Sequence, residues 1–259
     1  MAGTCLKALK TITIKSMFEP PDNEWIKGSH WLTSALLGCV PGIVHGFSCN
    51  LHAIPGNHEP GFDIQIVSTA EQVHSNRVEI IGPDVPPVPI PGADGLVTSS
   101  RNIALGIRTA DCVPLLLAHK NGKCIAAAHA GWRGTLKNIA SEAVKKMCSL
   151  LSCPAGELIA CIGPAIGPCC FEVGENVARD FEGRIGRAVV SRGADRKMRV
   201  DLLKANRIEL ERAGLEGRHI ETISLCTMCR ADLFPSYRRN PSEVTEKGSR
   251  IWSLIVRKG

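Results

Sequence analysis

The stretch Ile107–Thr135, IRTADCVPLLLAHKNGKCIAAAHAGWRGT, decides the fold of this chain. It holds two apolar runs, Val113–Ala118 and Lys123–Ala128. Between them lies an Asn-Gly pair, which favours a tight two-residue hairpin turn. The pattern therefore predicts two buried strands that pair antiparallel.

Polar residues gather where this hairpin opens. If the strands pair as predicted, Cys112 and His129 return to the same end, beside Asp111 and Arg133. Cys112 and His129 each border an apolar run and have glycine or charged residues nearby. Packing alone gives no reason for a polar residue at these positions. Cys112 and His129 could act as the nucleophile and base of a cysteine hydrolase. They could instead be two ligands of a metal, or both could simply be buried.

A third ligand is available in the string QVHSNRV, where His74 ends a strand predicted over Ile64–Val73. A His₂Cys set leaves a fourth tetrahedral position open, as in catalytic zinc sites. Metal-bound water has a pKa lowered towards 7 and becomes a nucleophile at neutral pH. In such a site Asp111 would orient a ligand imidazole or act as a base, and Arg133 would hold an anion.

The rest of the chain predicts one mixed α/β domain over residues 1–259, with neither internal repeats nor a linker. Apolar residues at three- and four-residue steps predict an amphipathic helix over Thr135–Leu151. The other predicted helices are Glu175–Phe181 and Asp201–Ala213, and further predicted strands are Glu157–Gly163, Glu221–Leu225 and Arg250–Val256.

The composition, 44% hydrophobic and 22% charged, is that of a globular protein. Aromatic residues make up only 4%, which argues against a stacking surface for single-stranded nucleic acid. The net charge of +6 is spread along the chain and suits anionic small molecules. There is no apolar run of about 18 residues, so we expect no membrane span. Because aromatic residues are scarce, we also expect no nucleic-acid partner.

Twelve cysteines are many for this length, but Met1–Phe18 lacks the apolar core of a secretory signal. We therefore expect a cytoplasmic protein with reduced cysteines, although the basic segment Met1–Met17 also suits a short organellar targeting peptide. Six cysteines are expected to pack as small apolar residues: Cys5, Cys39, Cys124, Cys148, Cys153 and Cys161.

Cys226–Cys229, CTMC, has the spacing of redox pairs and zinc knuckles. The chain has no second CxxC, since Cys169 and Cys170 are adjacent. We interpret the CTMC cysteines as incidental residues of a loop.

Several strings occur in the order typical of one family: QVHSNRV, ADGLVT, TADCVPLLL, AAAHAGWRGT, IGPAIGPCCFEVG, DLLKANR, CT and SYRR. In these strings the chain resembles YfiH-type proteins, once called polyphenol oxidases or laccase-domain proteins. The resemblance runs from about Val44 to Arg239, so residues 1–30 are expected to be peripheral.

The resemblance implies a layered α/β sandwich with a mixed sheet core flanked by helices. It also implies one catalytic zinc ion held by His74, Cys112 and His129. Small-molecule purine nucleosides and phosphate are the implied substrates. The implied reactions are phosphorolysis of adenosine, inosine, guanosine and 5′-methylthioadenosine, and deamination of adenosine to inosine. For phosphorolysis we expect Arg133, with Arg77 or Arg238, to hold phosphate.

The older laccase description can be tested on the residues. A multicopper oxidase needs roughly ten His and Cys ligands, largely in His-x-His pairs. This chain has 8 histidines and no such pair, so we reject a multicopper mechanism, while copper can occupy the single site in vitro. The chain also departs from the family at Asn50, where arginine is expected, and at Ser75, where glycine is usual.

Overall fold

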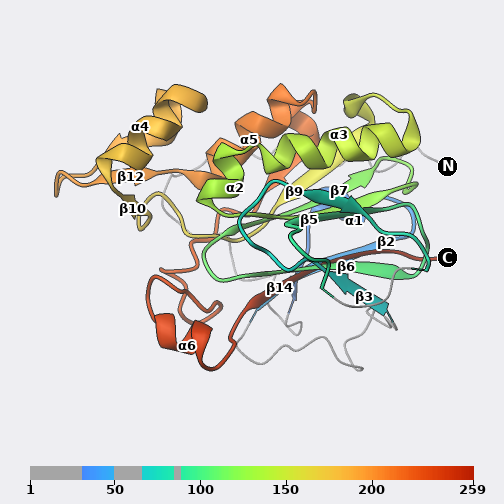
Figure 1. Cartoon of the computed structure of the whole chain (residues 1–259), viewed down its shortest axis with the longest axis horizontal. Coiled ribbons are helices and arrows are strands. Elements are labelled where there is room, and N and C mark those ends of the chain that lie inside the picture. The colour runs from blue at the N-terminus through green and yellow to red at the C-terminus, as the bar shows by residue number, and fades with distance from the viewer. Residues whose placement is uncertain (1–30, 50–65, 85–88) are drawn as a thin grey trace.

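The computed structural model describes residues 31–49, 66–84 and 89–259. Two mixed sheets are stacked, and helices cover the outer face of one of them (Figure 1). The six-stranded sheet has the order β13-β9-β7-β8-β5-β4. Its strands are β4 Val78–Ile80, β5 Gly95–Thr98, β7 Val113–His119, β8 Ile125–Ala130, β9 Leu158–Ile162 and β13 Ile220–Thr222.

The second sheet has five strands in the order β1-β2-β14-β6-β3. They are β1 Trp31–Leu32, β2 Ile43–Ser48, β3 Ile66–Thr69, β6 Ile103–Thr109 and β14 Ile251–Arg257. A small three-stranded sheet, β10-β12-β11, consists of β10 Glu172–Val173, β11 Val190–Arg192 and β12 Met198–Val200.

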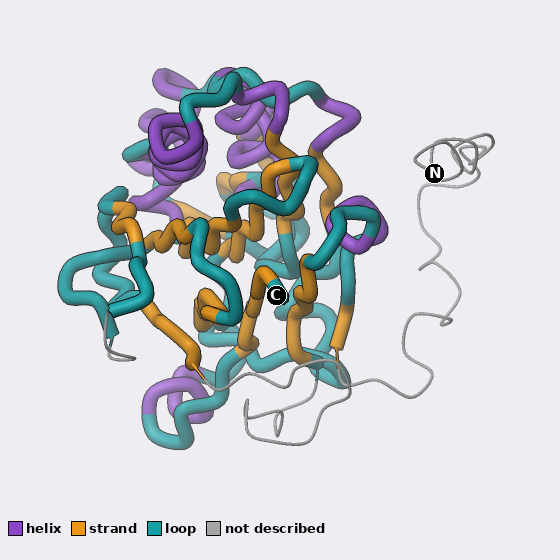
Figure 2. The backbone as a smooth tube through the Cα atoms, turned by 90° about the vertical axis from the view of Figure 1, so that its right-hand side faces the viewer, coloured by secondary structure: helices purple, strands orange, loops and turns teal. Residues whose placement is uncertain are grey.

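The helices α2 to α5 lie on one side of the two stacked sheets, as Figures 1 and 2 both show. The α-helices are α1 Ala35–Gly38, α2 Trp132–Leu136, α3 Ile139–Leu151, α4 Glu175–Arg184, α5 Leu202–Arg212 and α6 Pro241–Thr245. Short 3-10 helices span Ala155–Glu157, Arg187–Val189 and Gly217–His219. The layered α/β sandwich predicted from the sequence is confirmed.

Strand β7 explains why its sequence is apolar throughout. Leu115 and Leu117 belong to the core between the six-stranded sheet and the helices. Leu116 and Ala118 belong to the core between the two sheets. Successive side chains of a strand point to opposite faces, so a strand that is covered on both faces needs an unbroken apolar run.

The predicted hairpin is present, because β7 pairs antiparallel with β8 and Pro114 lies opposite His129. Its turn differs from the prediction. The His119 N–H donates to the Cys124 carbonyl at 2.9 Å, so Lys120–Lys123 forms a longer loop than the predicted two-residue turn. Gly122 has φ +64° there and its N–H donates to the His119 carbonyl, which closes the turn inside the loop.

Three further predictions need correction. β3 ends at Thr69, so His74 lies in a loop and does not end a strand. The predicted helix over 135–151 breaks between α2 and α3, where Asn138 adopts a left-handed conformation with φ 64°. Cys39 is exposed, whereas Cys124 and Cys161 are buried as expected.

The Asp201 carboxylate caps α5 by accepting from the Lys204 N–H, which confirms where this predicted helix starts. Among the described residues, no helix is both long and apolar enough to cross a membrane. Cys5, Asn50, the segment 1–30 and the targeting peptide considered for residues 1–17 lie outside the described residues.

Candidate metal centre

The open end of the β7–β8 hairpin positions two of the three predicted ligands. Cys112 directly precedes β7, and His129 is the penultimate residue of β8. The register that sets Val113 opposite Ala130 brings Cys112 and His129 to the same end of the sheet. Antiparallel pairing thus delivers the thiol and the imidazole together, as the sequence predicted.

His74 arrives from a loop that is shaped by a buried carboxylate. Gln72 and His74 have φ values of 69° and 61°, in the left-handed region that residues other than glycine rarely occupy. The Asp94 carboxylate accepts the N–H groups of Val73, His74 and Ser75 at 3.1, 2.9 and 2.7 Å. These hydrogen bonds hold the loop in its unusual conformation.

The same carboxylate orients His129, whose Nδ1 lies 2.8 Å from Asp94 Oδ1. The Nε2 atom of His129 is therefore left for a ligand, an arrangement common for metal-binding histidines. Burial raises the pKa of Asp94, but the hydrogen bonds from His129 and Ser75 outweigh it and lower that pKa. The sequence predicts Asp111 as the residue that orients an imidazole or acts as a base, whereas the carboxylate that orients His129 is Asp94. Asp94 lies in the string ADGLVT, whose residues alone do not indicate this role.

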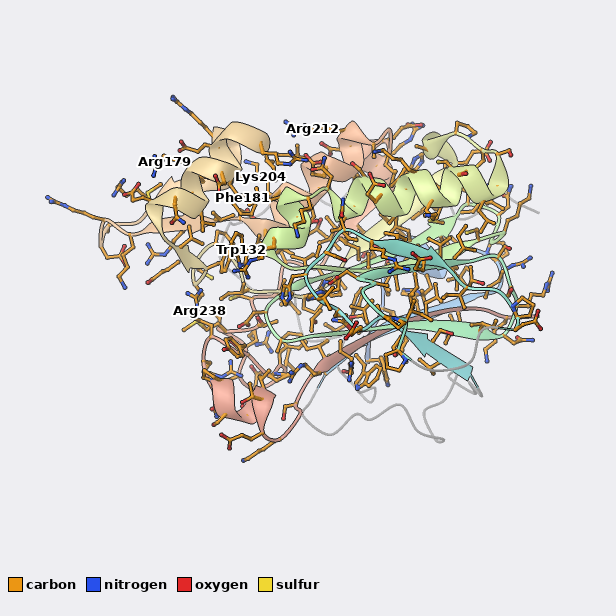
Figure 3. All side chains as sticks on the ribbon, viewed as in Figure 1. Trp132, Arg179, Phe181, Lys204, Arg212 and Arg238 are labelled. Atoms are coloured by element: carbon orange, nitrogen blue, oxygen red, sulfur yellow. The ribbon has the colours of Figure 1, made fainter. Side chains whose placement is uncertain are left out.

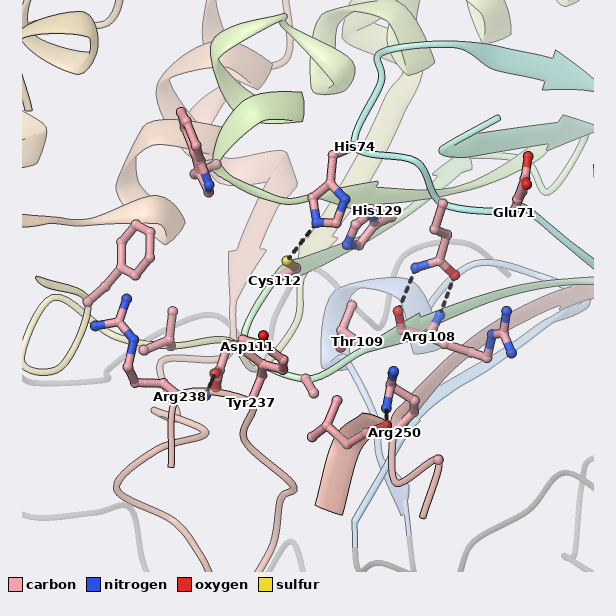
Figure 4. A pocket seen from close by; sticks show the side chains of 17 residues that line it. Glu71, His74, Arg108, Thr109, Asp111, Cys112, His129, Tyr237, Arg238 and Arg250 are labelled. Atoms are coloured by element: carbon pink, nitrogen blue, oxygen red, sulfur yellow. Dashed lines mark hydrogen bonds between the residues drawn. The ribbon is translucent and has the colours of Figure 1, made fainter. Parts of the chain in front are cut away.

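The three predicted ligands converge (Figure 4). One ligand atom from each of His74, Cys112 and His129 lies within 4.8 Å of the other two. Cys112 Sγ is 3.9 Å from His74 Nε2, and the two imidazole rings meet edge to face at 4.9 Å. Two imidazoles and one thiol are the donors that zinc prefers, and they leave one tetrahedral position for substrate or water.

The pKa values in this group favour a thiolate–imidazolium pair of Cys112 and His129, and a bound metal would have to displace the His129 proton. Burial raises the pKa of Cys112, but His129 and His74 outweigh it and lower that pKa to about 6. Burial lowers the pKa of His129, but Asp94 and Cys112 outweigh it and raise that pKa to about 9. A thiolate is the form that binds metal and the form that attacks carbon, so the pKa values leave both chemistries open.

Gly131 makes room for the three ligands. A Cβ atom at this position would lie 2.6 Å from His74 Cδ2 and 3.2 Å from Cys112 Sγ. Any side chain here would push the ligands apart, which explains why the first glycine of the HAGWRGT string, Gly131, is a glycine.

A cavity of about 590 Å³ opens beside the ligands, within the size range of small-molecule sites. Trp132 of α2 and Arg238 of the loop before α6 lie on its walls, at the same side of the molecule (Figure 3). The lining residues include His74, Cys112, His129, Asp111, Glu71, Gln72, Arg108, Trp132, Ile166, Phe171, Tyr237, Arg238 and Arg250.

Two arginines of this cavity were not predicted from the sequence. Arg108 lies near the end of β6 and Arg250 directly precedes β14, and the pairing of Trp252 with Arg108 brings them together. Among the described residues neither guanidinium has a carboxylate oxygen within 4.0 Å, whereas Arg77 pairs with Glu79 at 2.6 Å. Burial and the neighbouring charge of Arg108 lower the pKa of Arg250. Two adjacent cations without counter-ions are suited to bind an anion.

The predicted arginines lie in different places. Arg238 lines the cavity and its guanidinium lies 5.5 Å from the Phe171 ring centroid. Arg133 is exposed and stacks over Trp132 at 4.2 Å, and it does not line the cavity. Arg77 is exposed and likewise lies outside the cavity lining.

Asp111 lines the cavity, but both of its carboxylate oxygens are occupied. They accept from the Thr227 hydroxyl at 2.6 Å, the Ser236 hydroxyl at 3.0 Å and the Arg238 N–H at 2.7 Å. Asp111 therefore anchors the segment after β13, whose strings CT and SYRR supply these donors.

The CTMC cysteines lie in a loop, as the sequence predicts, but they do not stand alone there, because they meet the adjacent pair Cys169 and Cys170. The sulfur atoms of Cys169, Cys170, Cys226 and Cys229 all lie within 4.8 Å of one another. The adjacent pair after β9 thus supplies the partner that a second CxxC motif would have supplied.

The family model, the similar sequences and the similar structures all indicate the same protein family. The family model described as multi-copper polyphenol oxidoreductase laccase matches residues 57–258. The chain is 35% identical to "Adenosine deaminase RL5" from an unknown prokaryotic organism over 189 residues, covering 69% of this chain and 72% of that protein. It is also 35% identical to "Purine nucleoside phosphorylase RP494" of Rickettsia prowazekii over 198 residues, covering 75% and 80%.

Among solved structures, the hypothetical protein YfiH of Bacillus licheniformis superposes with a TM-score of 0.71 at 26% identity. The match covers 83% of this chain and 93% of that one. The resemblance to YfiH-type proteins is confirmed by the family model, the relatives and the fold together. The chain belongs to the laccase-like family of YfiH-type proteins, whose model carries the description multi-copper polyphenol oxidoreductase laccase.

Proposed function

We propose that this chain is a zinc-dependent purine nucleoside phosphorylase that also deaminates adenosine. The observation that carries the proposal is the open His₂Cys set in the wall of a cavity that also presents Arg108 and Arg250. Two relatives that are 35% identical to this chain over the aligned residues are named for these two activities. The nucleosides proposed as substrates are adenosine, inosine, guanosine and 5′-methylthioadenosine.

His74, Cys112 and His129 would hold the zinc ion. When bound in a site with an open position, zinc acts as a Lewis acid that polarises an oxygen atom of substrate or water. Asp94 keeps His129 in the tautomer that offers Nε2 to a metal.

The charged and aromatic walls of the cavity suggest how a nucleoside and phosphate are oriented. Arg108 and Arg250 lie on one side and Arg238 lies on the other, with the ligand set between them (Figure 4). Arg238 packs over Phe171, and both line the cavity with Trp132. We place phosphate at Arg108 and Arg250 and the purine against the aromatic wall, so that the ribose lies between them.

In phosphorolysis a phosphate oxygen forms a bond to C1′ of the ribose while the C1′–N9 bond breaks. The bonding electrons leave with the purine, which takes up one proton, and the products are the free base and ribose 1-phosphate. The arginines would hold the phosphate close to C1′, which supplies proximity and charge compensation. In deamination, water adds at C6 of adenosine and ammonia leaves. The proposed proton carrier is Asp111, through Oδ1, which accepts one hydrogen bond, whereas Oδ2 accepts two.

Purified protein with adenosine and phosphate should release adenine, and without phosphate it should release inosine and ammonia. His129→Ala should abolish both reactions, and unchanged turnover in this variant would remove the site assignment. Arg108→Gln should raise the KM for phosphate about tenfold or more, because a charge-assisted hydrogen bond contributes about 1.5–3 kcal/mol.

Matched controls separate the phosphate assignments. Arg101→Gln, on an exposed arginine that donates to the Lys258 carbonyl, should leave the KM for phosphate unchanged. Arg133→Gln tests the assignment made from the sequence. A large rise in KM for phosphate in Arg133→Gln but not in Arg108→Gln would favour that assignment over the one made from the cavity.

A metal-free cysteine hydrolase is the second candidate, because the pKa of Cys112 is lowered to about 6 next to His129. The two candidates differ in what protects the thiol. In the zinc enzyme, added zinc blocks alkylation of Cys112 by iodoacetamide. In the hydrolase, an ester substrate leaves an acyl group on Cys112, detected by mass spectrometry, and zinc inhibits turnover.

A further inference from the structure

We propose that Cys169, Cys170, Cys226 and Cys229 form a second, structural zinc site that braces one wall of the cavity. We call this group the four-cysteine cluster. The cluster shares no residue with the His74, Cys112 and His129 set. Its zinc would have four protein ligands and no open position, as in structural sites.

The spacing of the sulfur atoms fits this ion. A tetrahedral centre with Zn–S bonds of about 2.3 Å places its sulfur atoms about 3.8 Å apart. Cys229 Sγ lies 3.7 Å from Cys169 Sγ and 3.4 Å from Cys170 Sγ. None of the four cysteines forms a disulfide. A tetrahedral set of four thiolates selects zinc or iron over calcium and magnesium.

The backbone around the cluster is built to support it. Ala165 and Cys226 form a parallel bridge, and the Thr227 N–H donates to the Ala165 carbonyl at 3.1 Å. The Gly167 N–H donates to Cys226 Sγ at 3.2 Å, a bond that stabilises a thiolate. A Cβ atom on Gly167 would lie 3.2 Å from both Cys169 Sγ and the Cys226 Cβ, so only glycine fits easily between the two cysteine segments.

Positively charged arginine side chains lie near the four-cysteine cluster. Zinc with four thiolates carries two net negative charges, and guanidinium groups approach both cysteine segments. Arg238 donates to the carbonyls of Cys170 and Glu172, at 3.4 and 3.1 Å. Arg239 donates to the carbonyls of Thr227 and Met228, each at 2.9 Å. Cys169 and Cys229 are exposed, which gives a metal ion a path from solvent.

The cluster joins two segments that supply one wall of the cavity. The segment with Cys169 and Cys170 also carries Ile166 and Phe171, which line the cavity. The segment after Cys226 leads to Tyr237 and Arg238, which line it too. A metal at the cluster would therefore fix the aromatic and arginine wall relative to the His₂Cys set without touching substrate.

Zinc content measured by mass spectrometry on protein purified under reducing conditions tests the proposal. The wild-type chain should hold about two zinc ions, one for each proposed site. His129→Ala and the double variant Cys226→Ser/Cys229→Ser should each hold about one. A double variant of cysteines outside the cluster, Cys39→Ser/Cys148→Ser, should retain about two. The cluster variant should also melt about 5 °C or more below wild type, because it loses a bound metal.

Cobalt substitution identifies the ligands even if the cluster variant folds poorly. In the His129→Ala chain, bound cobalt(II) should give the intense sulfur-to-cobalt charge-transfer absorption of a tetrahedral four-thiolate centre. A wild-type chain with about one zinc ion and a mass reduced by two or four hydrogens would show disulfides and overturn the proposal. Iron in place of zinc, with the visible absorption of an iron–thiolate centre, would overturn the identity of the metal.

Discussion

Replacing Asp94 with asparagine should weaken the metal site although Asp94 is not itself a proposed ligand. Asp94 is fully buried and accepts from five donors. Oδ1 faces the His74 N–H and His129 Nδ1, and Oδ2 faces the N–H groups of Val73 and Ser75 and the Ser75 hydroxyl. An asparagine has the same shape but turns one oxygen into an NH₂ group.

The magnitude follows from the number of donors left without an acceptor. In either orientation the amide nitrogen of Asp94→Asn faces at least two N–H donors. A buried donor without an acceptor costs about 1–3 kcal/mol, so the free energy of unfolding should fall by about 2–6 kcal/mol. A lost outer partner of a metal-binding histidine typically weakens metal affinity about 10- to 100-fold.

The assay is a zinc competition titration with a chromogenic chelator, together with calorimetric melting. The four-cysteine cluster is untouched by the substitution, so the difference between wild type and Asp94→Asn isolates the His₂Cys site. Asp232→Asn is the matched control, because Asp232 is 61% exposed and pairs with Arg230 at the surface. Zinc affinity and melting temperature equal to wild type in Asp94→Asn would refute the role assigned to Asp94.

Two other predictions concern Gly131, beside the same ligands, and the buried His45 of β2. Gly131→Ala should displace His74 and Cys112 and weaken zinc binding at least about tenfold in the same titration, whereas Gly183→Ala, where a Cβ meets nothing within 4 Å, should not. Burial lowers the pKa of His45 from 6.5 to about 4, against the opposing charge of Glu221, so between these pH values the unfolded chain binds more protons than the folded chain. The free energy of unfolding should therefore fall as the pH drops through this window, by up to about 3 kcal/mol. His45→Gln should flatten that part of a denaturation-versus-pH curve, and an unchanged slope would contradict the assignment.

The sequence predicted the features that depend on local pattern. An unbroken apolar run, a turn signal and a second run predict the hairpin, and its antiparallel register carries Cys112 to His129. The start of α5 at Asp201 also depends on neighbouring residues, because the Asp201 side chain accepts from the N–H of Lys204 three residues later. Each of these follows from residues that are near in the chain.

The missed features arise from backbone shape and from contacts between distant segments. Asp94 gains its role because three successive N–H groups turn towards it through left-handed residues, and no side-chain pattern shows this. Arg108 and Arg250 become neighbours only through the pairing of β6 with β14. Arg133, which follows the HAGW string, lies outside the cavity lining, where its guanidinium stacks over the ring of Trp132 at the start of α2.

The site also bears on the laccase description of the family. His₂Cys is the ligand set of blue-copper centres, so copper has suitable donors at His74, Cys112 and His129. A multicopper oxidase must then pass electrons to further copper ions held mainly by histidines.

Among the described residues, one other cluster that could hold a metal ion contains a histidine, and it consists of His119, Cys153 and Glu157. Its His119 has Nε2 at 2.9 Å from Glu157 and Nδ1 accepting from the Asn121 N–H, so both ring nitrogens are engaged. The four-cysteine cluster offers thiolates alone, which suit zinc better than an oxygen-reducing copper cluster. Copper at the His₂Cys set would therefore have no adjacent copper centre among the described residues to receive its electron, which favours chemistry by polarisation over chemistry by electron transfer.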